Sequence, residues 1–272
     1  MPLTLAQLCR RIGFPADLTE CWLAYETGRT SVLDAELTRR LLCRGTWDDA
    51  FWELADRLED DQDHLLALWE EMRLACGSWD EYRRRGLPED VFDDTMRFCT
   101  RYVMDELKAS GRYRFTAGWW FPRQLALELF RLGSLEFEMA EEPEERRIYL
   151  HIPTDASLRP EDVDDSFRRW RAFMKAYYPD WQDAAWYCNS WLMSPVLSRL
   201  LPPGSRILAF QRRFEVLEVY EKNMGAVKWI WPGPDREAAD LPADNTLRRA
   251  MKAFLLDGGI PGWALARLKE EG

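Results

Sequence analysis

His151 is one of two histidines in the chain, and its position makes it a candidate for proton transfer. It lies in the run RIYLHIP (147–153), whose alternation places the aliphatic residues on one face of a strand and Tyr149 and His151 on the other. Pro153 cannot continue an interior strand, so the strand ends just after the histidine. Because ligands in open α/β sheets bind beyond the carboxyl ends of strands, His151 could serve a bound substrate there. The alternative is a structural histidine paired with Asp155.

A second run, AAWYCNSWLM (184–193), also carries polar groups within a hydrophobic alternation. Its period of two places Tyr187, Asn189 and Trp191 on one face. An asparagine buried there without a partner would cost about 1–3 kcal/mol, so we expect its amide to be hydrogen-bonded. The partner could be a protein group or a substrate.

A third run, ILAFQRRFEVLEVY (207–220), is predicted as a strand that aligns Gln211, Arg213 and Glu215 on one face. Polar residues on three neighbouring strands could converge on a cleft, which is a common way to build a substrate pocket. A satisfied polar network between strands would explain the same pattern.

Several classes of enzyme lack their defining motifs in this sequence. It contains no GxxxxGK[ST], GxSxG or HExxH motif and no CxxC pair, which disfavours P-loop enzymes, serine hydrolases, zincins and zinc ribbons. The glycine cluster at 258–262 follows a predicted helix and is read as its terminator. With two widely separated histidines we expect no metal site.

Composition limits the partners and the compartment. The net charge of −10, from 37 basic and 47 acidic residues, disfavours nucleic acid and anionic membranes as partners. The sequence shows no signal peptide and no apolar run long enough to span a bilayer. Six dispersed cysteines are typical of buried thiols in a reducing compartment, so we expect a soluble cytoplasmic protein.

The elements that must position these residues fall into two halves, with a predicted boundary at residue 112. The first half is predicted to be helical, and His64 is expected on the surface of one of its helices. We expect helices at residues 46–60, 61–77 and 88–111, ending at Gly77 and Gly111 in the last two cases. The second half alternates strands with helices, which indicates a mixed, largely covered sheet packed with the helical half. Its predicted strands are 134–139, 147–153, 184–193, 207–220 and 227–231, and its predicted helices are 121–132, 160–178, a short one opened by Ser194 and Pro195, and 246–258.

Four stretches of the second half resemble a known family. They are YLHIPTDASL (149–158), DDSFRRWRAF (164–173), the run from Trp186 to Val216, and LPADNTLRRAMKAFLLDGG (241–259) with the PGW that follows. The sequence is similar to bacterial acyltransferase-like proteins with a helical N-acyltransferase N-terminal domain and a GNAT-like C-terminal domain. The resemblance implies an α+β fold, with a helical domain over 1–112 packed on a GNAT-like mixed α/β sheet domain over 113–272.

The resemblance implies an N-acyltransferase that binds acyl-CoA between splayed strands and transfers the acyl group to an amine of a small molecule or peptide, without a metal. His151 or Glu215 would be the base, and Tyr187 would return a proton to the leaving thiolate. The expected substrate-binding residues are Asn189, Trp191, Gln211 and Arg213. The expected coenzyme-binding residues are Ser194, Arg199 and Arg206.

Two departures from the family pattern bear on activity. Asn189 stands where the resemblance leads us to expect a histidine, so this protein could have an altered or lost activity. The R/Q-x-x-G-x-G/A phosphate loop is absent, and the helix after Pro160 begins with acidic residues that repel phosphates. The alternatives are therefore a non-catalytic protein that binds a small molecule or peptide in an aromatic and polar cleft, and an interaction scaffold with a tryptophan-rich surface.

Overall fold

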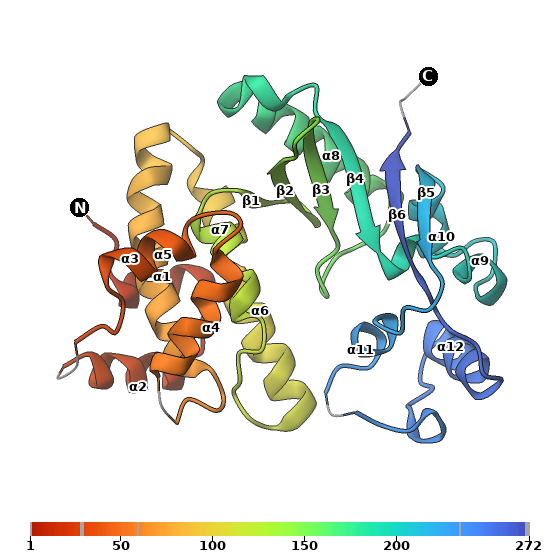
Figure 1. The fold of residues 1–272 in the computed structure, drawn as a ribbon, viewed down its shortest axis with the longest axis horizontal. Coiled ribbons are helices and arrows are strands. Elements are labelled where there is room, and N and C mark those ends of the chain that lie inside the picture. Colours follow the sequence, from red (N-terminus) through yellow and green to blue (C-terminus); the bar gives the residue numbers. More distant parts are fainter. Residues whose placement is uncertain (1, 28–29, 59, 234, 270–272) are drawn as a thin grey trace. The chain divides into compact units, whose positions relative to one another are not determined.

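The structure is a computed structural model that describes residues 2–27, 30–58, 60–233 and 235–269. It contains two compact units, Met1–Leu132 and Gly133–Gly272 (Figure 1). This division lies twenty residues after the boundary expected from the sequence. The reason is aromatic packing: Phe115 and Phe121 lie 6.1 and 5.7 Å, between ring centroids, from Phe98 in the longest helix of the first unit.

The first unit is helical, as predicted. Its helices are α1 (Leu5–Ile12), α2 (Ala16–Glu26), α3 (Ala35–Leu41), α4 (Trp47–Arg57), α5 (Leu65–Arg85), α6 (Glu89–Ser110) and α7 (Pro122–Leu125), followed by the strand β1 (Leu129–Leu132). The predicted ends of α6 are confirmed, with Gly111 in the left-handed conformation at φ 76°.

Three expectations for this unit were wrong. The helix α5 does not end at Gly77: buried Trp79 and Tyr82 continue its apolar stripe, and the left-handed cap is Gly86. The predicted helix 121–132 ends early because Leu127 adopts φ 58°, and β1 follows. His64 is half-buried beside Phe51, with ring centroids 6.1 Å apart, and is not a surface residue.

The second unit contains a mixed sheet with strand order β2-β3-β4-β6-β5 (Figure 1). The strands are β2 (Leu135–Glu141), β3 (Arg146–His151), β4 (Ala185–Ser190), β5 (Phe214–Tyr220) and β6 (Trp263–Leu268). The strands β3 and β4 run parallel, and the other neighbours are antiparallel. β6 was missed in the sequence. It separates β4 from β5, which are therefore not neighbours.

One face of this sheet is apolar and is covered by α8 (Pro160–Tyr177). The Trp170 ring stacks on Phe137 of β2 at 4.7 Å between centroids, and Phe167 meets Trp186 of β4 edge-on at 5.3 Å. The remaining helices are α9 (Leu197–Leu200), α10 (Arg206–Gln211), α11 (Ala226–Ile230) and α12 (Thr246–Leu256). The predicted helices α8 and α12 are confirmed. Because alternate side chains along each strand are buried under α8, the side chains between them must point to the opposite face of the sheet.

Two predicted strand segments are helical instead. Residues 206–211 form α10, in which Ala209 N–H donates to Ser205 O at 2.9 Å, so only the second half of the run 207–220 is a strand. Residues 227–231 belong mostly to α11, where Trp231 N–H donates to Val227 O at 2.9 Å. Short apolar runs of this kind fit either structure, because periodicity does not separate them.

Candidate functional site

The face of the sheet opposite α8 carries polar side chains from all five strands, and we call it the polar face. Cross-strand pairing aligns Glu138 with Tyr149, Tyr149 with Tyr187, Tyr187 with Arg267 and Arg267 with Glu215. One step further along, Glu136 is aligned with His151, and Asn189 with Leu265. The predicted alternation of β3 is therefore confirmed, with Ile148 and Leu150 buried on the other face.

The parallel strands β3 and β4 separate at their carboxyl ends. Their pairing covers only Arg147–Tyr149 against Ala185–Tyr187. Beyond that point β3 continues to His151 through its pairing with β2, and β4 continues to Ser190 through its pairing with β6. We call this opening the splay. His151 and Asn189 are the next residues of the polar face on its two sides.

His151 is held by a carboxylate on the neighbouring strand. Its Nε2 lies 2.9 Å from Glu138 Oε2, and the Glu138 side chain is only 8% exposed. A carboxylate accepts the Nε2–H, which leaves the lone pair of a neutral ring on Nδ1. Glu138 was missed in the sequence, although SLEFEM places two glutamates on one face of a predicted strand. That pattern was the available signal.

Tyr187 belongs to a polar cluster at the opposite end of β3. Its hydroxyl donates to Glu145 Oε1 at 2.8 Å, and Arg147 Nε donates to the same oxygen at 2.7 Å. Burial and the hydrogen bond to Glu145 raise the pKa of Tyr187, whereas the hydrogen bonds from Tyr187 and Arg147 lower the pKa of Glu145. The phenol therefore keeps its proton at neutral pH, and the carboxyl group is ionised.

Asn189 is exposed at the end of β4 and is hydrogen-bonded, as expected. Its Oδ1 accepts the indole N–H of Trp263 at 2.7 Å, so the partner is a protein group on β6. Trp191, by contrast, has left the strand: Ser190 ends β4 and its Oγ accepts Leu192 N–H at 3.1 Å, opening the short 3₁₀ helix Trp191–Met193. Trp191 therefore does not continue the alternation predicted for the run.

Gln211, Arg213 and Glu215 do not share a strand face, and this prediction was wrong. Gln211 ends α10 and donates to Ser194 O at 2.8 Å. Arg213 pairs with Asp164 at the start of α8. Glu215 lies exposed on β5, separated from β4 by β6. With strands about 4.8 Å apart, Glu215 is about 10 Å from β4. These residues therefore do not converge on the splay.

The expected coenzyme-binding residues differ in exposure and in their existing contacts. Ser194 is buried, and its hydroxyl donates to Pro261 O at 2.6 Å. The helix α9 begins at Leu197 and has only four residues. Arg199 and Arg206 are exposed on α9 and α10. The start of α8 is acidic, and its Asp162 accepts from Arg159 Nε at 2.7 Å. The two arginines remain available cations, whereas the serine hydroxyl is already used.

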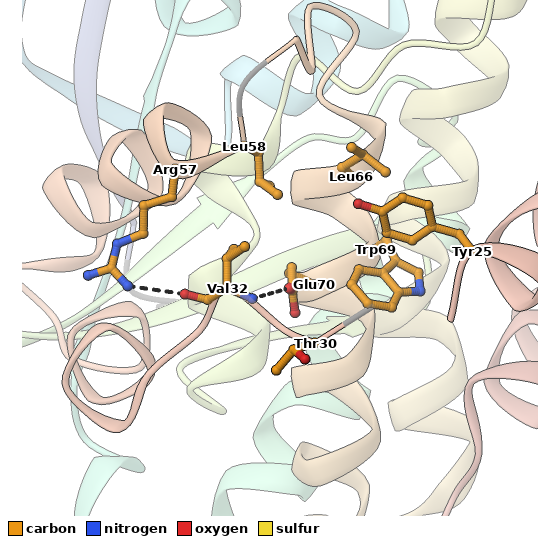
Figure 2. Close-up of a pocket in the computed structure, with 8 residues that line it drawn as sticks. All are labelled: Tyr25, Thr30, Val32, Arg57, Leu58, Leu66, Trp69 and Glu70. Atoms are coloured by element: carbon orange, nitrogen blue, oxygen red, sulfur yellow. Dashed lines mark hydrogen bonds between the residues drawn. The ribbon is translucent and has the colours of Figure 1, made fainter. Parts of the chain in front are cut away.

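The helical unit contains a separate pocket of about 240 Å³ (Figure 2). Its polar groups serve the fold: Glu70, buried on α5, accepts Val32 N–H at 2.8 Å and the Ser31 hydroxyl at 2.7 Å, and Arg57 donates to Val32 O at 3.1 Å. The apolar lining comes from Val32, Leu58, Leu66 and the ring of Trp69. Glu70 thus fastens the segment after α2 to α5.

Three global features follow from the described residues. No group of three or more histidine, cysteine, aspartate or glutamate side chains among them could hold a metal ion. None of the helices in the described ranges has the length and hydropathy to cross a bilayer. All six cysteines lie in described positions, and each is a free thiol.

Two family models together match most of the chain. The N-acyltransferase N-terminal domain matches residues 4–127, and the GNAT-like C-terminal domain matches residues 129–265. The chain belongs to this two-domain family. The predicted family and the predicted α+β class are thus confirmed, and the splay lies within the GNAT-like domain. The junction between the two matches falls close to the division between the compact units.

Solved structures share the fold over nearly the whole chain. An acyltransferase in complex with decanoyl-CoA is 20% identical, with a TM-score of 0.72, and the match covers 98% of this chain and 99% of that one. An acyltransferase mutant in complex with octanoyl-CoA is 20% identical, with a TM-score of 0.76 and coverage of 97% and 87%. An acyltransferase in complex with decanoyl-CoA and teicoplanin is 19% identical, with a TM-score of 0.70 and coverage of 98% and 100%. No curated protein matches the chain.

Proposed function

We propose that this protein is an N-acyltransferase that moves an acyl group from acyl-CoA to an amine. The observation that carries the proposal is the splay between β3 and β4, with His151 on one side and Asn189 on the other. GNAT-like proteins bind acyl-CoA between splayed strands, and solved relatives of this fold hold decanoyl-CoA and octanoyl-CoA.

The residues around the splay suit a thioester better than they suit a pyrophosphate. Strand edges that leave their partner offer backbone groups to an extended ligand, as in strand addition. The acidic start of α8 repels phosphates, so the coenzyme's phosphates would depend on the exposed Arg199 and Arg206. Ser194 is a poor additional ligand because its hydroxyl already donates to Pro261 O.

His151 is the preferred base for the incoming ammonium. Its Nε2–H is taken by Glu138, so Nδ1 carries the lone pair that accepts a proton, and the carboxylate stabilises the imidazolium that forms. Glu215 is less suitable, since β6 lies between its strand, β5, and β4 at the edge of the splay. Tyr187 keeps its proton but is a less suitable donor to the leaving thiolate than the sequence led us to expect, because its hydroxyl already donates to Glu145 near the start of β3.

The acceptor is proposed to be an amine on a small molecule or peptide. One relative was crystallised with teicoplanin beside decanoyl-CoA, which supports this class of acceptor. The net charge of −10 favours a cationic acceptor over nucleic acid or an anionic membrane. A cytoplasmic location in a bacterium is part of the same proposal, and the free cysteines support a reducing compartment.

Thermal unfolding with decanoyl-CoA, acetyl-CoA and free CoA at millimolar concentration tests binding. We expect at least one acyl-CoA to raise the melting temperature, because a ligand of the folded state stabilises it by mass action. Thiol release and mass spectrometry with a panel of amines then test transfer. If none of the three ligands raises the melting temperature, the proposal is contradicted. Binding without transfer to any amine supports the non-catalytic alternative.

A further inference from the structure

The Asn189 amide has a fixed orientation because of the residue that it contacts. The indole nitrogen of Trp263 is a donor only, so the atom 2.7 Å from it must be the amide oxygen of Asn189. The amide nitrogen, with two N–H groups, is then directed away from the indole. In the part of the chain that the structure describes, that nitrogen has no hydrogen-bond partner.

This donor lies at the splay, where the proposed function places the thioester of a bound acyl-CoA. Asn189 is exposed at the carboxyl end of β4, on the polar face, where β4 has separated from β3. Across the splay, β3 carries His151 on the same face of the sheet. A base and a neutral hydrogen-bond donor therefore flank the splay, and each is held by a partner outside it: Glu138 on β2 and Trp263 on β6.

We infer that Asn189 is a catalytic residue whose Nδ2 donates to the carbonyl oxygen of the bound thioester, and that Trp263 is its positioning residue. This inference depends on the proposed acyl transfer. The amine nitrogen bonds to the carbonyl carbon, and the carbonyl π electrons move to the oxygen, where Asn189 stabilises the negative charge. His151 takes the proton from nitrogen. The C–S bond then breaks as the carbonyl re-forms, and the CoA thiolate leaves and is protonated.

The asparagine is thus a functional replacement where a histidine was expected. A side-chain amide donates at every pH, whereas a histidine ring donates from both nitrogens only when it is protonated. The contacts therefore assign two separate roles: His151 on β3 accepts a proton, and Asn189 on β4 donates a hydrogen bond. The substitution is compatible with activity.

The test uses decanoyl-CoA labelled with ¹³C at the thioester carbonyl, and it needs no acceptor. In the wild-type complex we expect the carbonyl stretching frequency to fall below that of free decanoyl-CoA, because a hydrogen bond polarises the carbonyl. Asn189→Asp keeps the acceptor for Trp263 but lacks the N–H groups, and Asn189→Leu lacks both. Both variants should lose the frequency shift while still binding free CoA.

Kinetics with any amine that the wild type accepts supply a second measurement. Loss of one oxyanion donor lowers kcat by about 10²–10³-fold in other enzymes, and we expect Asn189→Leu to fall in this range with little change in KM. Trp263→Phe should lower kcat less, and adding it to Asn189→Leu should have no further effect. Additive effects would show that Trp263 does not act through Asn189.

Asn245→Asp is the matched control. Asn245 caps α12 by accepting Arg248 N–H at 2.9 Å, and aspartate caps equally well, so the same charge change occurs away from the splay. The inference is overturned if wild type and Asn189→Leu show the same carbonyl frequency. If the wild type does not bind decanoyl-CoA at all, that result contradicts the proposed function itself, and it is obtained before any variant is compared.

Discussion

Glu138 Oε2 on β2 lies 2.9 Å from His151 Nε2 on β3, at the end of the sheet where β3 and β4 separate. The carboxylate is nearly buried, whereas the imidazole is 24% exposed. A shielded anion behind a partly accessible ring is the arrangement that orients a general base and stabilises its protonated form.

His151→Ala should therefore lower the rate of acyl transfer by about 10²–10⁴-fold, the usual contribution of a general base. Glu138→Gln should lower it less, since the amide oxygen can still accept the Nε2–H but carries no charge. Steady-state rates with decanoyl-CoA measure both. His64→Gln, in the helical unit, is the control and should leave the rate unchanged. Equal rates in wild type and His151→Ala would remove His151 from the mechanism.

Arg199→Ala and Arg206→Ala should weaken binding of acyl-CoA without lowering kcat. Each loss should raise Kd by about tenfold, the equivalent of one charge-assisted contact of about 1.5 kcal/mol. Calorimetric titration with CoA at low and high salt measures the effect, which should shrink at high salt. Arg84→Ala removes an exposed arginine of the helical unit and should have no effect. Unchanged affinity in both variants would place the coenzyme's phosphates elsewhere.

Glu71→Gln should stabilise the protein at neutral pH. The Glu71 side chain is fully buried on α5, neither oxygen has a hydrogen-bond partner among the described residues, and burial raises its pKa well above the usual value. Because the folded-state pKa is the higher one, wild-type stability falls as pH rises above the unfolded value of about 4.3, until the folded pKa is reached.

The stability difference between Glu71→Gln and wild type should therefore grow with pH by up to about 1.4 kcal/mol per unit above pH 5. Urea unfolding at several pH values between 5 and 8 measures this slope. Glu20→Gln, at an exposed position of α2, should show no slope. A pH-independent difference for Glu71→Gln would mean that the carboxyl group is ionised in the folded protein.

Two glycine substitutions should have opposite effects on the helical unit. A Cβ at Gly118 would clash with the ring of Phe51, so Gly118→Ala should destabilise by about 1–3 kcal/mol through overpacking. Gly77 lies inside α5 with no atom within 4 Å of an added Cβ. Gly77→Ala should therefore stabilise by about 0.5–1 kcal/mol. Thermal melts measure both, and a destabilising Gly77→Ala would contradict an unbroken α5.

Local patterns in the sequence were sufficient to predict those elements whose type or end is set by neighbouring residues. The alternation around His151 predicted β3, and Gly111 predicted the end of α6, because side-chain period and left-handed caps are local properties. The strand predicted over the run containing Gln211 was wrong in its first half, because the local pattern there is ambiguous. Its short apolar stretch fits a helix or a strand, and the Pro-Gly turn before Ser205 favours the helix.

The site itself depends on pairing between distant segments, which the sequence alone does not specify. β6 lies over seventy residues after β4 in the chain, yet it supplies Trp263, the partner of Asn189. Glu138 meets His151 only because β2 and β3 pair in a particular register. The residue types were recognisable in the sequence. Their partners became identifiable only when the strand order was known.

The splay has a consequence for how ligands would be discriminated. Since β2 pairs with the last residues of β3 and β6 pairs with the last residues of β4, the two strands are already separated at their carboxyl ends in the protein without a ligand. The free energy needed to separate the strands is part of folding and is the same for every acyl-CoA. Differences in affinity among chain lengths would then measure contacts of the acyl chain itself, with no contribution from opening the sheet.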